Sequence, residues 1–278
     1  AGVDMQLGAG DAGGGPAHAF HRVGRDVVVV FGVVELQRAA DGGRTLELAE
    51  IRAHLGETGV RLLTLVGLGG MGKTRLAIEA ARAHAPACPD GVYFVSFAPQ
   101  VAPVTLASAV AGALGMALQG VDVWSEALRM LRPRRALLVL DGFEHLLAVP
   151  QPRAGDGGEA GEQGAVRALV ELLEAAPGLQ VIATSRVRLG IPGEHVFAVD
   201  GLEYPRRAPV DEAAAAPAVR LLVASARRRL PRFTLTAAKV PTVLRICDLV
   251  RGMPLGIELA AAWFELLTPE EVAQEIAK

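Results

Sequence analysis

One eight-residue run, at positions 67–74, constrains this chain more than any other stretch. Its sequence, GLGGMGKT, matches the Walker A pattern G-x-x-x-x-G-K-[ST] at every fixed position. An apolar run at 62–66 precedes it and a helix-forming segment follows, which is the strand, loop and helix context that the pattern needs. The sequence therefore predicts an α/β fold with an anion-binding loop between a buried strand and a helix.

The residue types of this run suit the binding of a phosphate chain. Glycine has no Cβ, so several backbone N–H groups can approach one anion, and the following helix adds the positive end of its dipole. We expect Lys73 to reach the β and γ phosphates and the Thr74 hydroxyl to bind Mg²⁺. A glycine-rich turn without a ligand is the competing interpretation, which the flanking strand and helix disfavour. The predicted nucleotide-binding residues of the loop are Gly67, Leu68, Gly69, Gly70, Met71, Gly72, Lys73, Thr74 and Arg75.

The composition is that of a globular chain without a membrane segment. Of its 278 residues, 51% are hydrophobic and 21% are charged, and no run approaches the roughly 18 apolar residues that cross a bilayer. The start lacks the basic and apolar regions of a secretory signal, and the two cysteines do not make a disulfide framework. The net charge of −2 argues against a nucleic-acid surface. We expect a cytoplasmic protein with no membrane contact and no direct nucleic-acid contact from this segment.

From residue 43 onward, helical segments alternate with short apolar runs, which predicts a three-layer α/β fold with a parallel sheet. The runs that read as buried strands are 62–66, 92–97, 136–140, 179–184 and 196–199. After about residue 201, alanine-rich helical segments dominate. The predicted domains are therefore a P-loop nucleotide-binding domain at 43–200 and a small helical lid subdomain at 201–278, which we expect to be truncated.

Residues 1–42 fit either a linker or the remnant of an upstream domain. Glycine-rich stretches flank an apolar run at 27–36, and that run fits either an extra strand or the remnant of an upstream domain. Both interpretations stay open on the sequence alone.

Charged residues follow two of the predicted strands. Asp141 comes directly after the third strand, at the carboxyl end where parallel sheets place ligands, so we expect it to hold Mg²⁺ together with Thr74. A helix N-cap is its alternative role, and the two roles are compatible. Glu144 fits equally a residue that orients attacking water and a first-turn helix acid. Arg186, after the fourth strand, is expected to contact the γ phosphate. With Lys73, these form the predicted catalytic set.

Five segments of the chain resemble, in order, the NB-ARC-type signal-transduction ATPases with numerous domains (STAND ATPases), in the form found in large bacterial transcriptional regulators, cyclases and kinases. The segments are GLGGMGKTRLA, LLVLDGFEHLL, IATSRVRLGIPGEHVF, AVRLLVASARRRLPRFTLT and ICDLVRGMPLGIELAAAW. The resemblance covers about residues 43–278. It implies that the loop binds ATP or ADP, that Asp141 is the Walker B acid, that Arg186 is sensor 1 and that Pro254 lies against the adenine.

The resemblance also implies a Gly-Arg-Glu motif that touches the base end of the nucleotide. Two segments are candidates for it, VGRD at 23–26 and GGRT at 42–45. The second lies at the family's usual distance before the loop, so Gly43 and Arg44 are the predicted residues.

Several positions depart from the family's pattern. Gly142 stands where an Asn or a second acid is usual, which weakens the expectation of fast hydrolysis. Thr45 replaces the usual Glu, Met253 the usual Leu, and Leu68 a common Pro. The glycines, Lys73 and Thr74 that bind phosphate are intact.

Together, the motifs and the resemblance predict an ATP/ADP-binding switch with slow, Mg²⁺-dependent ATP hydrolysis. Its expected partners are nucleotide and the sensor and output domains of a longer chain, with homo-oligomer formation on activation. A non-hydrolysing scaffold with a permanent nucleotide is the main alternative. A small-molecule kinase is a weaker one, because the helical continuation shows no evident acceptor pocket.

Overall fold

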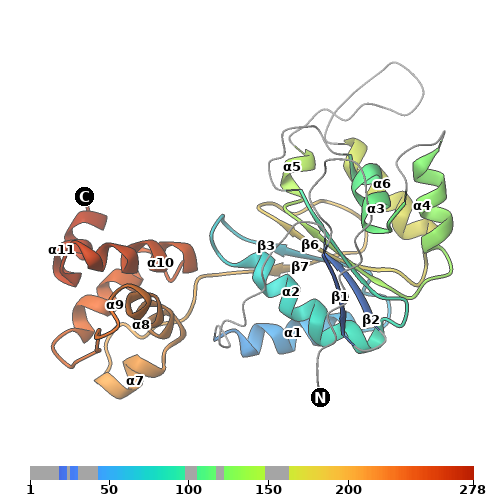
Figure 1. Ribbon diagram of the computed structural model, residues 1–278. Helices are drawn as coiled ribbons and strands as arrows, with labels where there is room; N and C mark the ends of the chain where they lie inside the picture. Colours follow the sequence, from blue (N-terminus) through green and yellow to red (C-terminus); the bar gives the residue numbers. More distant parts are fainter. Residues whose placement is uncertain (1–18, 24–25, 31–42, 98–104, 117–121, 148–162) are drawn as a thin grey trace. The chain divides into compact units, whose positions relative to one another are not determined.

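The computed structural model describes residues 19–23, 26–30, 43–97, 105–116, 122–147 and 163–278 (Figure 1). These residues form two compact units. The sheet unit comprises the described parts of Ala1–Gln37, Glu50–Val66 and Thr74–Phe197. The helical unit comprises residues 43–49, the loop Gly67–Lys73, and Ala198–Lys278. The sequence-based domain boundaries stay predictions, and the helical unit takes in two short segments that lie before residue 200.

A seven-stranded sheet forms the centre of the sheet unit, in the order β1-β2-β4-β5-β6-β3-β7 (Figure 1). Strands β2, β4, β5, β6 and β3 pair in parallel, and β1 pairs with β2 antiparallel. Their bounds are β1 (Ala19–Val23), β2 (Asp26–Val30), β3 (Leu62–Val66), β4 (Val92–Ser96), β5 (Leu137–Asp141), β6 (Gln180–Ser185) and β7 (Glu194–Ala198). The predicted α/β P-loop fold with a parallel sheet is confirmed.

All five predicted strands overlap observed ones, with ends that differ by at most two residues. The prediction that the last of them is buried was wrong, because β7 lies at the edge of the sheet and Val196 is 52% exposed. An edge strand has a neighbour on one side only. The central strands β3, β4 and β5 are buried apart from their last residue, as expected for parallel strands covered on both faces.

Two strands, β1 and β2, fall within the N-terminal segment 1–42. The backbone register pairs Val28 with Val92 and Val30 with Phe94, so β2 extends the parallel sheet beyond β4. Of the two interpretations of the run 27–36, an extra strand describes its first residues, and residues 31–36 lie outside the described ranges.

Helices cover the sheet on both of its faces. In Figure 1, α3, α4 and α6 lie on one face and α2 lies on the other. The core beneath the first group includes Phe143, Leu138 and Leu169, which are at most 2% exposed. The helices of this unit, with α1 shared between the units, are α1 (Thr45–Gly56), α2 (Lys73–His84), α3 (Leu106–Ala113), α4 (Val123–Leu131), α5 (Glu144–Leu147) and α6 (Gln163–Ala175), with a 3₁₀ turn η1 (Ala85–Ala87).

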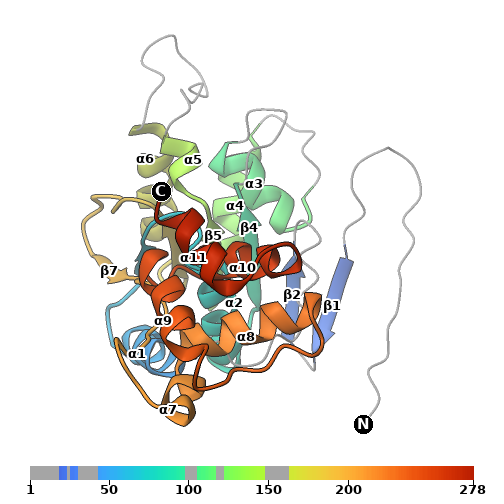
Figure 2. The ribbon, with the colours of Figure 1, turned by 90° about the vertical axis from the view of Figure 1, so that its left-hand side faces the viewer.

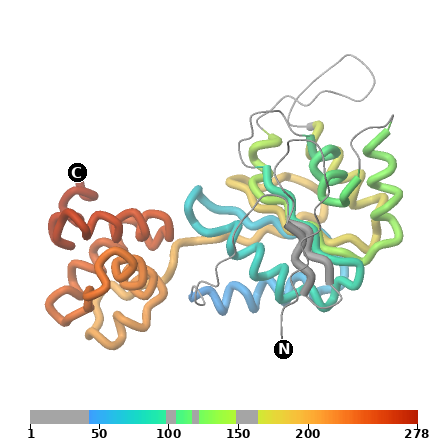
Figure 3. The backbone as a smooth tube through the Cα atoms, in the orientation of Figure 1, coloured from blue at the N-terminus to red at the C-terminus, as the bar shows by residue number. Residues whose placement is uncertain are grey.

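The helical unit is a bundle of helices (Figures 2 and 3) with an apolar core of its own. In this bundle α8 packs on α10 and α9 packs on α11. Its most buried residues include Leu222, Val243 and Ile257, each fully buried. Cys247 lies in the same core, where burial raises the pKa of its thiol to about 12. The elements are α7 (Val210–Ala215), α8 (Pro217–Arg229), α9 (Val240–Leu249), α10 (Pro254–Ala262), η2 (Trp263–Glu265) and α11 (Pro269–Ile276).

Two glycines allow the segment before α7 to approach the turn that precedes α10. The Leu202 N–H donates to the Gly252 carbonyl at 2.7 Å. A Cβ on Gly201 would lie 2.0 Å from the Arg251 carbonyl oxygen, and one on Gly252 would lie 2.2 Å from the Leu202 oxygen. Gly252 also has φ +64°, so a side chain there would be strained as well as crowded. This contact fixes the turn that leads into Pro254.

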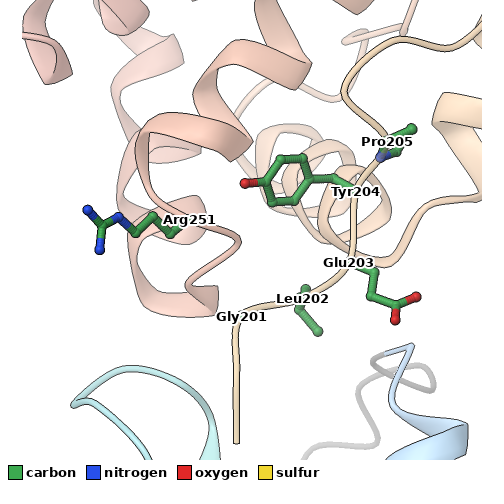
Figure 4. A pocket seen from close by; sticks show the side chains of 6 residues that line it. All are labelled: Gly201, Leu202, Glu203, Tyr204, Pro205 and Arg251. Atoms are coloured by element: carbon green, nitrogen blue, oxygen red, sulfur yellow. The ribbon is translucent and has the colours of Figure 1, made fainter.

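A cavity of about 530 Å³ opens beside this contact (Figure 4). Tyr204 lies at its wall and donates its hydroxyl to Asp248 at 3.1 Å, and burial together with Asp248 raises the pKa of Tyr204. The lining residues are Gly201, Leu202, Glu203, Tyr204, Pro205 and Arg251, none of which is a predicted site residue.

Arg61 ties the strand that enters the phosphate loop to the end of α6. Its guanidinium donates to the carbonyls of Leu173, Ala176 (2.7 Å) and Leu179 (3.3 Å), which are carbonyls at and just after the end of that helix. Burial lowers the pKa of this guanidinium. Because the carbonyls at a helix end lack partners within the helix, Arg61 satisfies groups that would otherwise depend on water.

Replacing this residue tests its contribution. We expect Arg61→Leu to lower the free energy of unfolding by about 2 kcal/mol, because charge-assisted hydrogen bonds are lost and carbonyls are left unpaired. Urea denaturation measures the change. Arg52→Leu, at an exposed position of α1, is the matched control and should change stability by less than about 0.5 kcal/mol. Equal losses in the two variants would contradict the assigned role.

Candidate functional site

The phosphate loop adopts the backbone that its glycines predict. Gly70 and Gly72 have φ values of +81° and +82°, in the left-handed region where L side chains are strained. Lys73 follows, is 8% exposed, and donates its ammonium to the carbonyls of Gly67 (2.7 Å) and Leu68 (2.9 Å). The loop therefore bends back on itself and holds its one ammonium group against its own backbone.

The glycines of the loop are required for different reasons. A Cβ on Gly67 would lie 2.5 Å from the Val199 carbonyl oxygen, so packing excludes a side chain there. A Cβ on Gly70 would lie 2.9 Å from the Leu255 Cβ, and the Leu255 N–H donates to the Gly70 carbonyl at 3.2 Å. A Cβ on Gly72 would meet nothing closer than Pro254 Cγ at 3.8 Å, so only its dihedral angle demands glycine. The first turn of α10, with the predicted residue Pro254, thus lies beside the loop.

In the sheet unit, two hydroxyls converge on one carboxylate oxygen. Thr74 Oγ1 donates to Asp141 Oδ1 at 2.6 Å, and Thr184 Oγ1 donates to the same atom at 2.7 Å. Thr184 Oγ1 also accepts from the Gly142 N–H at 2.8 Å. Strand order explains the meeting, because β5 and β6 are parallel neighbours whose carboxyl ends share one edge of the sheet.

The two predicted Mg²⁺ ligands are therefore in direct contact, which suits this ion. Mg²⁺ prefers oxygen ligands, keeps several waters, and binds through one or two carboxylates plus substrate phosphates. A hydroxyl and a carboxylate that already lie together supply that donor set. Within the described ranges there is no group of three or more His, Cys, Asp or Glu that would form an all-protein cage.

The predicted catalytic pair Glu144 and Arg186 also comes together. Arg186 Nε lies 3.2 Å from Glu144 Oε1; the Arg186 side chain is 62% exposed and the Glu144 side chain 18%. Glu144 Oε2 is buried and has no hydrogen-bond partner within the described part of the chain. A buried carboxylate oxygen without a donor is costly unless water or ligand supplies one. Glu144 begins α5, so both roles predicted for it are compatible with its position.

Gly43 packs against Pro217, and Arg44 donates to backbone carbonyls of the loop and of the segment after β7. Gly43 has φ +70°, and a Cβ there would lie 2.4 Å from Pro217 Cβ. Arg44 Nη2 donates to the carbonyls of Met71 (2.9 Å) and Asp200 (2.7 Å), and Nη1 pairs with Glu47 at 2.9 Å. Their predicted contact with the base end of the nucleotide stays a prediction.

The remaining loop residues differ in exposure. Met71 is 8% exposed and Leu68 is 62% exposed, while Arg75 is exposed in the first turn of α2 and Gly69 lies at the tip of the loop. Two residues outside the predicted set take part in the arrangement, Thr184 and Leu255. The position of Thr184 directly before Ser-Arg at a strand end was a usable signal, whereas the Leu255 amide left no trace in the sequence.

The strand, loop and helix around residues 67–74, together with an acid at the end of a parallel strand that meets the loop's threonine, define a P-loop NTPase. Residues 61–208, more than half of the chain, match the family described as NACHT domain. The chain belongs to the NACHT domain family, whose members are STAND-class P-loop NTPases, and this membership implies nucleotide binding.

The chain is similar to proteins that are considerably longer than it is. "Putative HTH-type transcriptional regulator Rv0890c" of Mycobacterium tuberculosis is 37% identical over 214 residues, which is 77% of this chain and 21% of that protein. "Uncharacterized protein Rv0894" of the same organism is 32% identical over 232 residues, which is 83% of this chain and 52% of that protein. The chain spans about a fifth and about half of the length of these relatives.

Two solved structures are similar to this chain at a low level. One is a STAND protein with a tetratricopeptide repeat sensor from Pyrococcus horikoshii, with a TM-score of 0.44 and 18% identity, covering 84% of this chain and 32% of that chain. The other is a DNA replication initiation factor, with a TM-score of 0.47 and 16% identity, covering 86% of this chain and 65% of that chain.

None of the helices in the described ranges has the length and apolar character needed to traverse a bilayer.

The hydroxyl of Thr184 can be tested against a natural control. Thr184 and Thr64 are both buried on neighbouring parallel strands, 1% and 0% exposed, but Thr64 Oγ1 has no hydrogen-bond partner among the described residues. We expect Thr184→Val to lower the free energy of unfolding by about 1–2 kcal/mol, since the Gly142 N–H and the Asp141 carboxylate each lose a partner.

Thr64→Val should be neutral or stabilising by up to about 1 kcal/mol, because it removes a buried polar atom that is not hydrogen-bonded. Urea denaturation of both variants gives the comparison. A loss for Thr64→Val as large as that for Thr184→Val would show that the Thr184 hydrogen bonds do not hold the carboxylate.

Proposed function

We propose that this chain is the nucleotide-binding switch of a longer protein: it binds ATP or ADP with Mg²⁺ and hydrolyses ATP slowly. The observation that carries the proposal is the hydrogen bond between Thr74, the last residue of the phosphate loop pattern, and Asp141 at the end of β5. This contact assembles the two metal ligands of a P-loop NTPase from segments 67 residues apart.

Phosphate binding rests on the loop that ends at Lys73. Gly70 and Gly72 have the positive φ values that a turn of successive backbone N–H groups around an anion requires. Lys73 would exchange its contacts with the carbonyls of Gly67 and Leu68 for contacts with the β and γ phosphates. Bound Mg²⁺ would neutralise charge on the phosphates and would be held by Thr74 and Asp141.

Slow hydrolysis follows from the residue after the Walker B acid. Gly142 has φ +75° and no side chain, so it cannot orient the attacking water. Glu144 is the nearest acid in sequence, and its buried Oε2 is available to accept a hydrogen bond from that water. Arg186 pairs with the other oxygen of the same carboxylate and lies just after the end of β6, from where it would contact the γ phosphate.

The switch role is supported by the contact between the loop and α10. The Leu255 N–H donates to the Gly70 carbonyl, so a change of the loop backbone on binding or losing a γ phosphate would alter this bond. A ligand shifts a conformational equilibrium only through its different affinity for the two states. ATP and ADP differ by the group that would contact Lys73 and Arg186, and that difference would favour different arrangements of the helical part.

The longer protein to which the switch belongs, and the nucleotide base that it binds, are inferred from relatives and from the resemblance to NB-ARC-type ATPases. A protein named as a transcriptional regulator is 37% identical and far longer, which supports output domains elsewhere in the chain. The NB-ARC resemblance supports adenine as the base, with Pro254 beside it, and homo-oligomer formation on activation. Cytoplasmic location belongs to the same proposal. The alternative, a non-hydrolysing scaffold with a permanent nucleotide, is favoured by Gly142.

Binding is tested at the ammonium of the loop. Lys73→Ala should lower the affinity for ATP and for ADP by about 100-fold or more in titration calorimetry, because a buried, charge-assisted phosphate contact is lost. Lys278→Ala, which removes an exposed ammonium at the end of α11, should leave both affinities unchanged. Unchanged affinity in Lys73→Ala would rule out the loop as the phosphate site.

Hydrolysis is tested at the carboxylate. Asp141→Asn retains an oxygen for the Thr74 and Thr184 hydroxyls but removes the charge that holds Mg²⁺, so we expect turnover to fall by about 100-fold while nucleotide affinity changes only a few-fold. Release of inorganic phosphate measures turnover. Wild-type protein that binds ATP and shows no turnover would select the scaffold alternative.

A further inference from the structure

The Arg44 guanidinium donates hydrogen bonds to two backbone carbonyls of the helical unit. Its Nη2 donates to Met71 O at 2.9 Å and to Asp200 O at 2.7 Å, and its Nη1 pairs with Glu47 Oε1 at 2.9 Å. The side chain is only 10% exposed. Nη2 has two hydrogens, so these two carbonyls use all of its donors. The group therefore points at the phosphate loop and the segment after β7.

A hydrogen bond to Met71 O orients more than one atom. The peptide bond between Met71 and Gly72 is trans and planar, so its carbonyl and its N–H point in opposite directions. With the oxygen held by Arg44, the Gly72 N–H must face away from Arg44. Gly72 has φ +82° and no side chain, so nothing within the residue itself would select that orientation.

The preceding peptide plane is held in the same way. The Leu255 N–H donates to Gly70 O at 3.2 Å, which orients the plane between Gly70 and Met71. Two successive peptide planes at the centre of the loop are thus set by donors outside it, Arg44 on one and Leu255 on the next. Loops rich in glycine lose much conformational entropy on ordering, so a loop held in its binding geometry beforehand binds its ligand more tightly.

We propose that Arg44 is a positioning residue for the phosphate cradle: it acts through the Met71 carbonyl and aims the Gly72 amide at the bound phosphates. This inference rests on the proposed nucleotide binding and assigns Arg44 a different role from contact with the base. Its effect is exerted on the polyphosphate, so it is independent of the base and ribose.

The inference is tested by comparing the binding of ATP with the binding of inorganic tripolyphosphate. Tripolyphosphate has the phosphate chain but no nucleoside. Arg44→Gln should weaken binding of both ligands by the same factor, about tenfold, because one charge-assisted hydrogen bond that orients the cradle is lost. If Arg44 contacts the base end, the variant loses affinity for ATP alone, and the inference is overturned. Titration calorimetry at a temperature well below the unfolding midpoint gives both constants.

A conservative variant separates geometry from charge. Arg44→Lys keeps the positive charge but not the planar guanidinium, so it should bind both ligands more weakly than wild type and more tightly than Arg44→Gln. Full affinity in Arg44→Lys would mean that charge alone matters and would overturn the inference. If Arg44→Gln does not fold, Arg44→Lys carries the ligand comparison by itself.

Arg82→Gln is the matched control. Arg82 forms the same kind of ion pair, with Glu79 three residues before it at 2.9 Å, on the exposed surface of α2. It should leave both affinities unchanged, and a loss equal to that of Arg44→Gln would overturn the inference. Wild-type protein that binds neither ligand would overturn the nucleotide-binding proposal as well, whereas selective loss of ATP in Arg44→Gln would leave that proposal standing.

Discussion

The hydrogen bond from the Thr74 hydroxyl to the Asp141 carboxylate is the contact on which the rest of this site depends. It joins the start of α2, the helix that follows β3 and the phosphate loop, to the end of β5. Strands β3 and β5 are not neighbours in the sheet, because β6 lies between them. Thr184 on β6 donates to the same oxygen and so completes the connection. The parallel order β5-β6-β3 is therefore what places Thr74, Asp141 and Thr184 together at one edge of the sheet.

In the phosphate loop the protein uses backbone groups as much as side chains. Arg44 and Leu255 act on carbonyls of the phosphate loop, and Lys73 bonds to two further carbonyls. Gly70 has two tasks, since its positive φ shapes the loop and its missing Cβ admits Leu255. A glycine that the sequence marks as part of a phosphate loop is thus also a packing residue, in contact with the first turn of α10.

The sequence predicted the parts of this fold that depend on local pattern. The five strands were found within two residues because their apolar runs are short and bounded by turn residues, and the loop was found because its spacing is strict. Membership of the NACHT family supports the broader STAND-class assignment, while the narrower NB-ARC relationship and the domain boundaries stay predictions. The exposure of β7 was not predictable, because an apolar run does not reveal whether a strand lies at the centre or the edge.

Residue order alone determined that this chain has a phosphate loop between a strand and a helix, and that an acid follows a later strand. The sequence also predicted that Asp141 and Thr74 share a site. Only the tertiary structure decided that Thr184 donates to the same carboxylate oxygen, that Glu144 pairs with Arg186, and that Arg44 donates to Met71 and Asp200. The physical reason is that local propensity and periodicity act over a few residues, whereas these contacts arise from strand order and from close approaches of backbone that only packing of distant segments produces.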